Sequence, residues 1–246
     1  MNLNQFLQNQ EKNYNEIRNL QRLVVEEKGI EPDPALVERR GGFFIVLIHS
    51  TVITRKAMRF SREVSKRAPA IVYGSTHVHT TLGRCTFGFG PQFYFNAHTD
   101  KKGAGILRKL SDVISNISET IPRNALEINY TEYLLTPHSL IAAGTPNEVF
   151  VKMLNLMIEE GKRRNIEINP PWGAHITLSR FTERRTLREM SPVLSTQLGK
   201  AAPFGRSAPI GIAAGYTFRE PKERHFVDLR KTPGHFRPYK VFLFPK

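Results

Sequence analysis

Apolar positions that recur at steps of three and four residues predict four amphipathic helices along the chain. The first runs from Leu3 to Val24 and ends before Pro32 and Pro34, because proline cannot continue a helix. Three more are predicted over residues 54–67, 106–117 and 149–165. The Thr145-Pro-Asn-Glu148 sequence before the last helix has the form of a capping box, with proline at the first helical position.

Short apolar runs and alternating apolar positions predict strands between and after these helices. Before the fourth helix they cover residues 43–48, 71–85, 126–130 and 139–144. After it they cover residues 173–181, 210–214, 225–230 and 239–244. An aromatic stretch over residues 86–96 is predicted to form a further strand pair with a turn near Gly90-Pro91.

The composition is that of a globular protein. Apolar residues make up 40% and charged residues 24% of the 246 residues, which is enough for a sizeable core in one domain or two lobes. A single cysteine, Cys85, excludes a disulfide framework and a zinc site built on paired cysteines. No apolar run reaches the roughly 18 residues of a membrane span, and the polar N-terminus lacks the pattern of a signal peptide. We therefore expect a soluble protein of a reducing compartment, the cytoplasm.

The charge balance adds an expectation about partners. Lys and Arg number 36 against 22 Asp and Glu, which gives a formal net charge of +14. Such a surplus favours a polyanionic partner, first RNA or another nucleic acid and second an acidic membrane, although it could also serve solubility alone. The outer face of the predicted helix over residues 54–67 carries many of these cations: Arg55, Lys56, Arg59, Arg62, Lys66 and Arg67.

One sequence motif occurs twice. His79-Thr-Thr-Leu-Gly-Arg-Cys-Thr86 aligns without a gap on His175-Ile-Thr-Leu-Ser-Arg-Phe-Thr182, at an offset of 96 residues and with five of eight positions identical. The same offset carries the apolar strand over residues 43–48 onto the one over residues 139–144, so each copy follows the order strand, helix, strand. A duplication explains motif, offset and element order together. Two similar lobes related by a pseudo-twofold axis would bring both motifs into one cleft.

The repeated residues are suited to acid–base chemistry. Because side chains alternate along a strand, His79 and Thr81 share one face, as do His175 and Thr177. An imidazole can give or accept a proton near neutral pH. Two imidazoles on opposite sides of a phosphodiester could divide these tasks, while the threonine hydroxyls hold the non-bridging phosphate oxygens. This scheme requires no metal.

Two His-x-Thr motifs, flanked by apolar residues and about one lobe apart, resemble the two-histidine (2H) phosphoesterase superfamily. Its members include bacterial 2′-5′ RNA ligase-like proteins and the cyclic nucleotide phosphodiesterases of tRNA splicing. The resemblance covers roughly residues 43–245. It implies an α+β, bilobal, duplicated fold with antiparallel sheets lining a central cleft and helices outside. It also implies chemistry on 2′-linked or 2′,3′-cyclic phosphoesters, by ligation or hydrolysis, without metal or cofactor, with His79 as proton donor and His175 as proton acceptor.

Residues 1–40 have no evident place in the minimal family fold, and Thr80 stands where an apolar residue is more usual. We therefore expect a helical N-terminal extension over residues 1–40 and a two-lobed phosphoesterase-like domain over residues 41–246. The expected activity is that of a phosphodiesterase acting on RNA ends or small 2′-linked oligonucleotides. Two alternatives stay open: a hydrolase of 2′-5′ or cyclic oligonucleotide signals, and an RNA-binding module without turnover.

Other polar and aromatic residues near the motifs carry weaker expectations. His77 shares a strand face with His79, but no third metal ligand stands at a suitable spacing, so we expect no metal site. Arg84 and Arg180 also repeat, but strict strand alternation places them on the face opposite the histidines, and they are left out of the site. Trp172 could stack on a base, but a packing role is the simpler interpretation.

Overall fold

The computed structural model describes residues 1–37, 41–85, 95, 99–122, 124–186, 188–189, 204–218 and 235–245. The predicted strand over residues 225–230 lies outside the described residues, and so does the predicted strand pair over residues 86–96, apart from residue 95.

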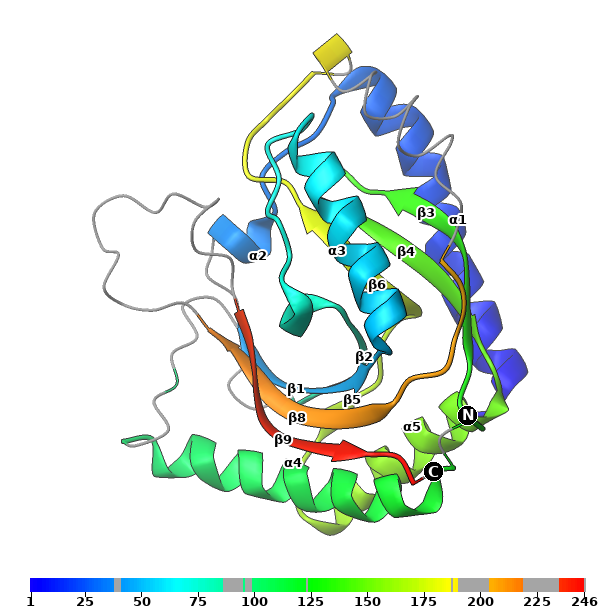
Figure 1. The fold of residues 1–246 in the computed structure, drawn as a ribbon, viewed down its shortest axis with the longest axis vertical. Coiled ribbons are helices and arrows are strands. Elements are labelled where there is room, and N and C mark those ends of the chain that lie inside the picture. The colour runs from blue at the N-terminus through cyan, green and yellow to red at the C-terminus, as the bar shows by residue number, and fades with distance from the viewer. Residues whose placement is uncertain are drawn as a thin grey trace.

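All four predicted amphipathic helices are present in the structure (Figure 1). The described helices are α1 (Leu3–Glu27), α2 (Pro34–Val37), α3 (Thr51–Ser65), α4 (Lys101–Thr120) and α5 (Glu148–Arg163). The predicted capping box before α5 is wrong, because Pro146 ends a strand and Asn147 is the N-cap. The Asn147 side chain donates its amide to the carbonyl of Ala125, 2.6 Å away, and makes no cap hydrogen bond.

The strands form one antiparallel sheet. They are β1 (Gly42–Ile48), β2 (His79–Cys85), β3 (Ile128–Leu135), β4 (Ser139–Pro146), β5 (Ile168–Asn169), β6 (Ala174–Arg180), β7 (Gly205–Ser207), β8 (Gly211–Phe218) and β9 (His235–Leu243). Their order is β7-β3-β4-β6-β2-β1-β8-β9, with β5 beside β2. The order is symmetric about the β6–β2 junction. We call β2-β1-β8-β9 the first lobe and β6-β4-β3-β7 the second lobe.

The chain path confirms the duplication. The first lobe contains the order β1-α3-β2 and the second lobe contains β4-α5-β6. The lobes meet where Thr80 of β2 pairs with Ile176 of β6, so the repeated motifs lie side by side at the centre of the sheet. The predicted α+β, bilobal and duplicated fold is therefore confirmed, with the strands of both lobes joined in a continuous sheet.

Residues 71–78 do not form the predicted strand. They run as an irregular segment that ends in a 3-10 turn over Ser75–His77. Only the Ile71 amide bonds to the backbone of a strand among the described contacts, to the Arg180 carbonyl of β6 at 2.9 Å. Side chains bond to other backbone groups: the Ser61 hydroxyl accepts from the Tyr73 amide, and the Ser179 hydroxyl donates to the Ile71 carbonyl. This segment therefore crosses the second lobe before β2 begins at His79.

Helices cover the sheet where its apolar side chains need burial. α4 packs against β8 and β9, and Figure 1 shows it beneath these strands, on the other side from α3. α3 buries Ile53, Ala57, Phe60 and Val64 as one stripe, and Phe60 stacks on Tyr133 of β3 with ring centroids 4.5 Å apart. α1 runs along β3. Within the described residues, no helix combines the length and the apolar character that crossing a bilayer requires.

Candidate functional site

A cavity of about 480 Å³ opens where the two lobes meet. It is lined by both copies of the repeated motif: His79, Thr81, Arg84, His175, Thr177 and Arg180. The four residues predicted from the sequence are therefore brought to a single cavity, as the duplication requires.

Strand alternation explains how the histidines and threonines reach this cavity. In β2, the partly exposed His79 and Thr81 alternate with Thr80 and Leu82, which are buried. In β6, His175 and Thr177 alternate in the same way with buried apolar neighbours. Each histidine and threonine pair thus shares the cavity face of its strand, while the apolar residues point into the core.

The expectation that both arginines face away from the histidines is wrong. Gly83 pairs with Ile45 and Thr81 pairs with Val46, so Leu82 is an extra residue in β2. β6 has the same irregularity relative to β4, where Leu178 is the extra residue. Such a bulge reverses the alternation that follows it. Arg84 and Arg180 therefore return to the cavity side.

The two histidines have equivalent hydrogen bonds. Nδ1 of His79 lies 3.2 Å from the carbonyl oxygen of Thr76, and Nδ1 of His175 lies 3.2 Å from that of Gly173. Because a carbonyl can only accept, each Nδ1 is the donor in this bond, and Nε2 is left as the basic nitrogen. The two rings are therefore prepared for proton transfer through the same atom.

The two histidines also have equivalent electrostatics. Burial lowers the pKa of His79 to about 4, against the opposing effect of the Thr76 carbonyl, and Arg180 adds to the lowering. Burial likewise lowers the pKa of His175 to about 4, with the Gly173 carbonyl opposing and Arg180 and His79 contributing. Both imidazoles are consequently neutral at pH 7.

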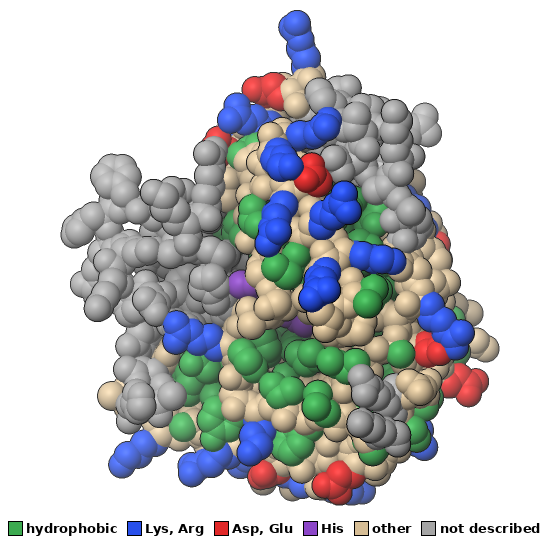
Figure 2. All heavy atoms as spheres, viewed as in Figure 1, with side chains coloured by type: hydrophobic (Ala, Val, Ile, Leu, Met, Phe, Trp, Pro, Cys, Tyr) green, Lys and Arg blue, Asp and Glu red, His purple; other side chains and the backbone are tan. Residues whose placement is uncertain are grey.

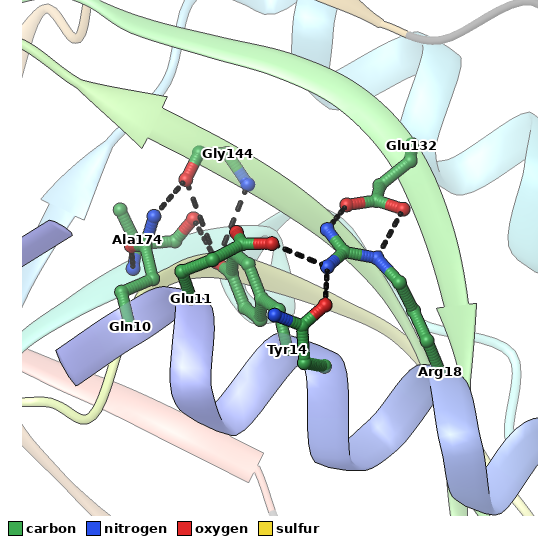
Figure 3. Close-up of polar contacts among 8 residues, drawn as sticks. Gln10, Glu11, Tyr14, Arg18, Glu132, Gly144 and Ala174 are labelled. Carbon is green, nitrogen blue, oxygen red and sulfur yellow. Dashed lines mark hydrogen bonds and ion pairs between the residues drawn. The ribbon is translucent and has the colours of Figure 1, made fainter. Parts of the chain in front are cut away.

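The N-terminal helix α1 is tied to the residue that precedes His175 (Figure 3). The Gln10 side chain accepts from the amide of Ala174 at 2.7 Å and donates to the carbonyl of Gly144 at 3.0 Å. The Tyr14 hydroxyl donates to the carbonyl of Ala174 at 3.0 Å. Because Gln10 and Tyr14 are buried, these bonds fix the start of β6 against α1.

An aromatic contact continues from α1 to the histidine itself. The Tyr14 ring meets Trp172 edge-on at 5.7 Å, and Trp172 stacks on His175 with centroids 4.3 Å apart at 24°. Trp172 is still 42% exposed and lines the cavity, so its free face is open to a ligand. The sequence favoured a packing role for Trp172 over stacking on a base. In the structure Trp172 packs against Tyr14 and also contacts His175 of the site.

Arg180 is held by the segment that follows α1. Its guanidinium donates to the carboxylate of Asp33, whose side chain is only 5% exposed, and it also bonds to Tyr73. Burial alone would lower the pKa of Arg180, but Tyr73 and Asp33 raise it, so the guanidinium keeps its charge. Asp33 lies 147 residues from its partner, and no local sequence pattern indicated this pair.

Two further histidines, His49 and His77, are buried in the part of the chain that the structure describes. His49 is buried between Ser207 and Thr80, with each hydroxyl 3.0 Å from a ring nitrogen. His77 lies in the 3-10 turn before β2, so it does not share a strand face with His79 as expected. It lines the cavity and is buried beneath Tyr73, with the rings 5.0 Å apart and nearly parallel. Among the described residues, no group of three or more His, Cys, Asp or Glu could hold a metal ion.

No protein-family model matches the sequence, and no curated protein is similar to it. The crystal structure of TT0787 of Thermus thermophilus has a similar fold, with a TM-score of 0.51, 13% identity, and coverage of 83% of this chain and 97% of that chain. E. coli LigT complexed with NADP+ gives a TM-score of 0.48 at 12% identity, over 84% of this chain and 99% of that chain.

A phosphoesterase crystal structure gives a TM-score of 0.46 at 13% identity, over 84% of this chain and 99% of that chain. At such low identity, the likeness to TT0787 establishes the fold and nothing finer. That fold agrees with the architecture implied by the two motifs, including the pairing of two duplicated lobes around one cavity. The chain has an α+β, bilobal fold that is similar to that of TT0787.

Proposed function

We propose that this protein is a metal-independent 2H phosphodiesterase that hydrolyses 2′,3′-cyclic or 2′-5′-linked phosphoesters of RNA or oligonucleotides. The observation that carries the proposal is the matched pair of His-x-Thr-Leu-x-Arg strands at a single cavity. A packed core has no need of two imidazoles, two hydroxyls and two guanidinium groups in equivalent positions. A reaction on one phosphate, with one proton accepted and another donated, needs them all.

The proposed reaction balances around the phosphorus atom. His175 accepts a proton from water as the water oxygen bonds to phosphorus, and His79 donates a proton to the ribose oxygen whose bond to phosphorus breaks. This division of roles follows the family resemblance. After one turnover His175 is protonated and His79 is neutral, and exchange with solvent restores both. The product is a phosphomonoester and a free ribose hydroxyl.

The other cavity residues stabilise the phosphate. Thr81 and Thr177 can donate hydrogen bonds to its non-bridging oxygens, and Arg84 and Arg180 add positive charge where negative charge develops. The lowered histidine pKa values fit this arrangement. A bound phosphate anion favours the protonated form of a nearby imidazole, so substrate binding would cause one histidine to take up a proton from solvent, and this histidine is then the proton donor.

The proposal is tested by assaying the purified protein against 2′,3′-cyclic nucleotides, 2′-5′ oligoadenylates and cyclic oligonucleotides, with the position of the product phosphate determined. We expect hydrolysis that persists in excess EDTA. His138→Gln, at the turn between β3 and β4, removes a histidine that does not line the cavity and serves as the control. Binding of these compounds without turnover would favour the RNA-binding alternative, and loss of activity in EDTA that zinc restores would contradict the proposal.

A further inference from the structure

The exposed side of α3 and the turn after it carry six cations. Arg55, Arg59, Arg62 and Lys66 follow one another at steps of four, three and four residues, which aligns them along one helix face. Lys56 and Arg67 are exposed beside them, and we call these six residues the α3 cationic face. The single acid between Thr51 and Arg67 is Glu63, which pairs with Lys66 at 2.8 Å. Figure 2 shows these cations as a blue column over α3.

The α3 cationic face adjoins the candidate site. α3 begins at Thr51, three residues after Ile48, and Ile48 is the register partner of His79. The face extends along the helix for about 16 Å from Arg55 to Lys66, at 1.5 Å per residue. At its far end lies a second hollow of about 350 Å³, lined in part by Lys66, Arg67 and Arg185. In Figure 2, histidine atoms are visible in the recess beside the near end of the column.

The sheet face that carries His79 and Thr81 also has an exposed apolar edge, which is separated from the cavity by the buried Val46 and Ala213. Across the first lobe, His79 is in register with Ile48, then Gly211 and then Leu243 of β9. Because register partners share a sheet face, Leu243 lies on the cavity face of the sheet, where it is 68% exposed. The neighbouring row from Thr81 ends at Val241, which is 46% exposed. Figure 2 shows apolar atoms gathered over these strands, below the blue column.

We propose that the substrate is an unpaired oligonucleotide strand whose phosphates follow the α3 cationic face and whose bases contact the exposed apolar edge at Val241 and Leu243. The inference rests on the proposed function and extends it from a single phosphate to a chain. Cations in line with a phosphate site suit a backbone with one charge per nucleotide. Apolar contact suits bases that are not paired, because a duplex hides their faces. A flat bilayer would not follow the recess in which His79 lies.

The experiment compares a 2′,3′-cyclic mononucleotide with a ten-nucleotide single strand that ends in a 2′,3′-cyclic phosphate. The test variant is Arg55→Gln/Arg59→Gln/Arg62→Gln. The control is Lys152→Gln/Lys162→Gln/Arg163→Gln, which removes the same charge from α5, away from the cavity. We expect the single strand to be the better substrate of the unaltered protein. The α3 variant should lower kcat/KM for the strand on the order of tenfold at low salt, and lower that for the mononucleotide much less.

A binding measurement keeps the proposal separate from catalysis. A fluorescent single strand with a 3′-phosphate is titrated into His79→Ala/His175→Ala protein, with and without the α3 changes. We expect the log–log salt dependence of binding to fall by about 2 in the α3 variant, at roughly 0.7 per lost phosphate contact. A hairpin of equal charge should bind more weakly than the single strand.

Each failure has its own signature. Hydrolysis of neither substrate, with strand binding that depends on the α3 cationic face, would contradict the proposed activity and keep this inference. Equal hydrolysis of both substrates, unchanged by the α3 substitutions, would overturn the inference and leave the activity. Binding to phosphatidylserine vesicles that depends on the α3 cationic face, without binding to the strand, would overturn it in favour of a membrane surface.

Discussion

The two copies of the repeated motif have the same local geometry in different surroundings. Both strands contain the bulge after the threonine, both histidines bond through Nδ1 to a carbonyl, and both have a pKa lowered to about 4 by burial. Around His79 the additional contact is Phe236 of β9, tilted at 5.0 Å. Around His175 it is Trp172, backed by Tyr14 of α1. The reacting groups are thus duplicated, and their supports are not.

The difference comes from the N-terminal segment. Among the described contacts, this segment touches the second copy of the motif and not the first. Gln10 and Tyr14 bond to Ala174, and Asp33 holds Arg180. The segment is itself anchored, because Phe6 packs against Phe150 at 5.4 Å and Arg18 pairs with Glu132. The division into an extension over residues 1–40 and a domain over residues 41–246 stays a prediction. These contacts show that residues of the expected extension are built into one side of the site.

The largest expected effect comes from the residues in which the two copies agree. His79→Ala and His175→Ala should each lower kcat/KM for a 2′,3′-cyclic nucleotide by about 10²–10⁴-fold, the usual value of a general acid or base. The double variant should lose far less than the product of the two, because the histidines act on one reaction together. Thr81→Ala and Thr177→Ala should cost less, since neither moves a proton. Full activity in His175→Ala would show that the copies are not equivalent in function.

The second effect separates the two arginines. Arg180→Gln removes the guanidinium that pairs with the buried Asp33 carboxylate, so it should lower the free energy of unfolding by about 3 kcal/mol. Arg84→Gln is the matched substitution in the first copy, and we expect it to change stability less, because Asp33 contacts the second copy. Urea denaturation of both variants measures the difference. Adding Asp33→Asn to Arg180→Gln should restore part of the loss, and a double variant less stable than Arg180→Gln alone would contradict the role given to the pair.

The third expected effect is a change in the environment of His175 without a change at His79. Gln10→Ala leaves the buried Ala174 amide without its partner, and we expect a loss of about 1–3 kcal/mol in stability and on the order of tenfold in kcat. The limb of the pH–rate profile that belongs to His175 should shift, while that of His79 stays in place. Arg18→Gln is the matched control, because it loosens α1 at a partly exposed ion pair without touching β6. If both variants shift both limbs equally, α1 does not position His175.

The smallest effect concerns stability against pH. Burial lowers the pKa of His49 to about 3 and those of His79 and His175 to about 4, from 6.5. Between these values the unfolded chain binds more protons than the folded one, so stability is full above pH 6.5 and is lost as the pH falls toward 4. Each histidine contributes at most ~1.4 kcal/mol per pH unit, less where it is partly exposed.

Urea midpoints at pH 7.5 and pH 5 measure this dependence. His79→Ala and His175→Ala should flatten it by similar amounts, because the pKa values of the two copies are lowered alike. A pH dependence that neither change alters would show that these histidines titrate normally in the folded protein.

Much of the fold could be predicted from the sequence because its elements depend on local patterns. The stripe through Phe60 and Val64 identified α3, and the repeated His-x-Thr identified both central strands. The strand expected over residues 71–78 does not form, because the hydroxyls of Ser61 in α3 and Ser179 in β6 bond to its backbone. A pattern of apolar residues contains no information about such partners.

The site, like the fold, could be predicted where it depends on local sequence patterns. Strand alternation correctly placed the histidines and threonines together, and the same rule misplaced Arg84 and Arg180 because the bulges are not visible in the sequence. The sequence did contain one signal that the arginines belong to the site, because both are repeated with the motif. For these two residues, repetition was a better guide than strand alternation. Gln10 and Tyr14 could not be found, since each lies 160 or more residues from Ala174.

The central claim is that His79 and His175 act on one phosphate. It is tested most directly by NMR titration of both imidazoles, with and without adenosine 2′-phosphate or 3′-phosphate, which requires no turnover. The account predicts a pKa near 4 for both histidines in the free protein, and a rise for at least one of them with chemical-shift changes at both when the nucleotide binds. A response confined to one histidine, with the other unaffected by saturating nucleotide, would contradict it.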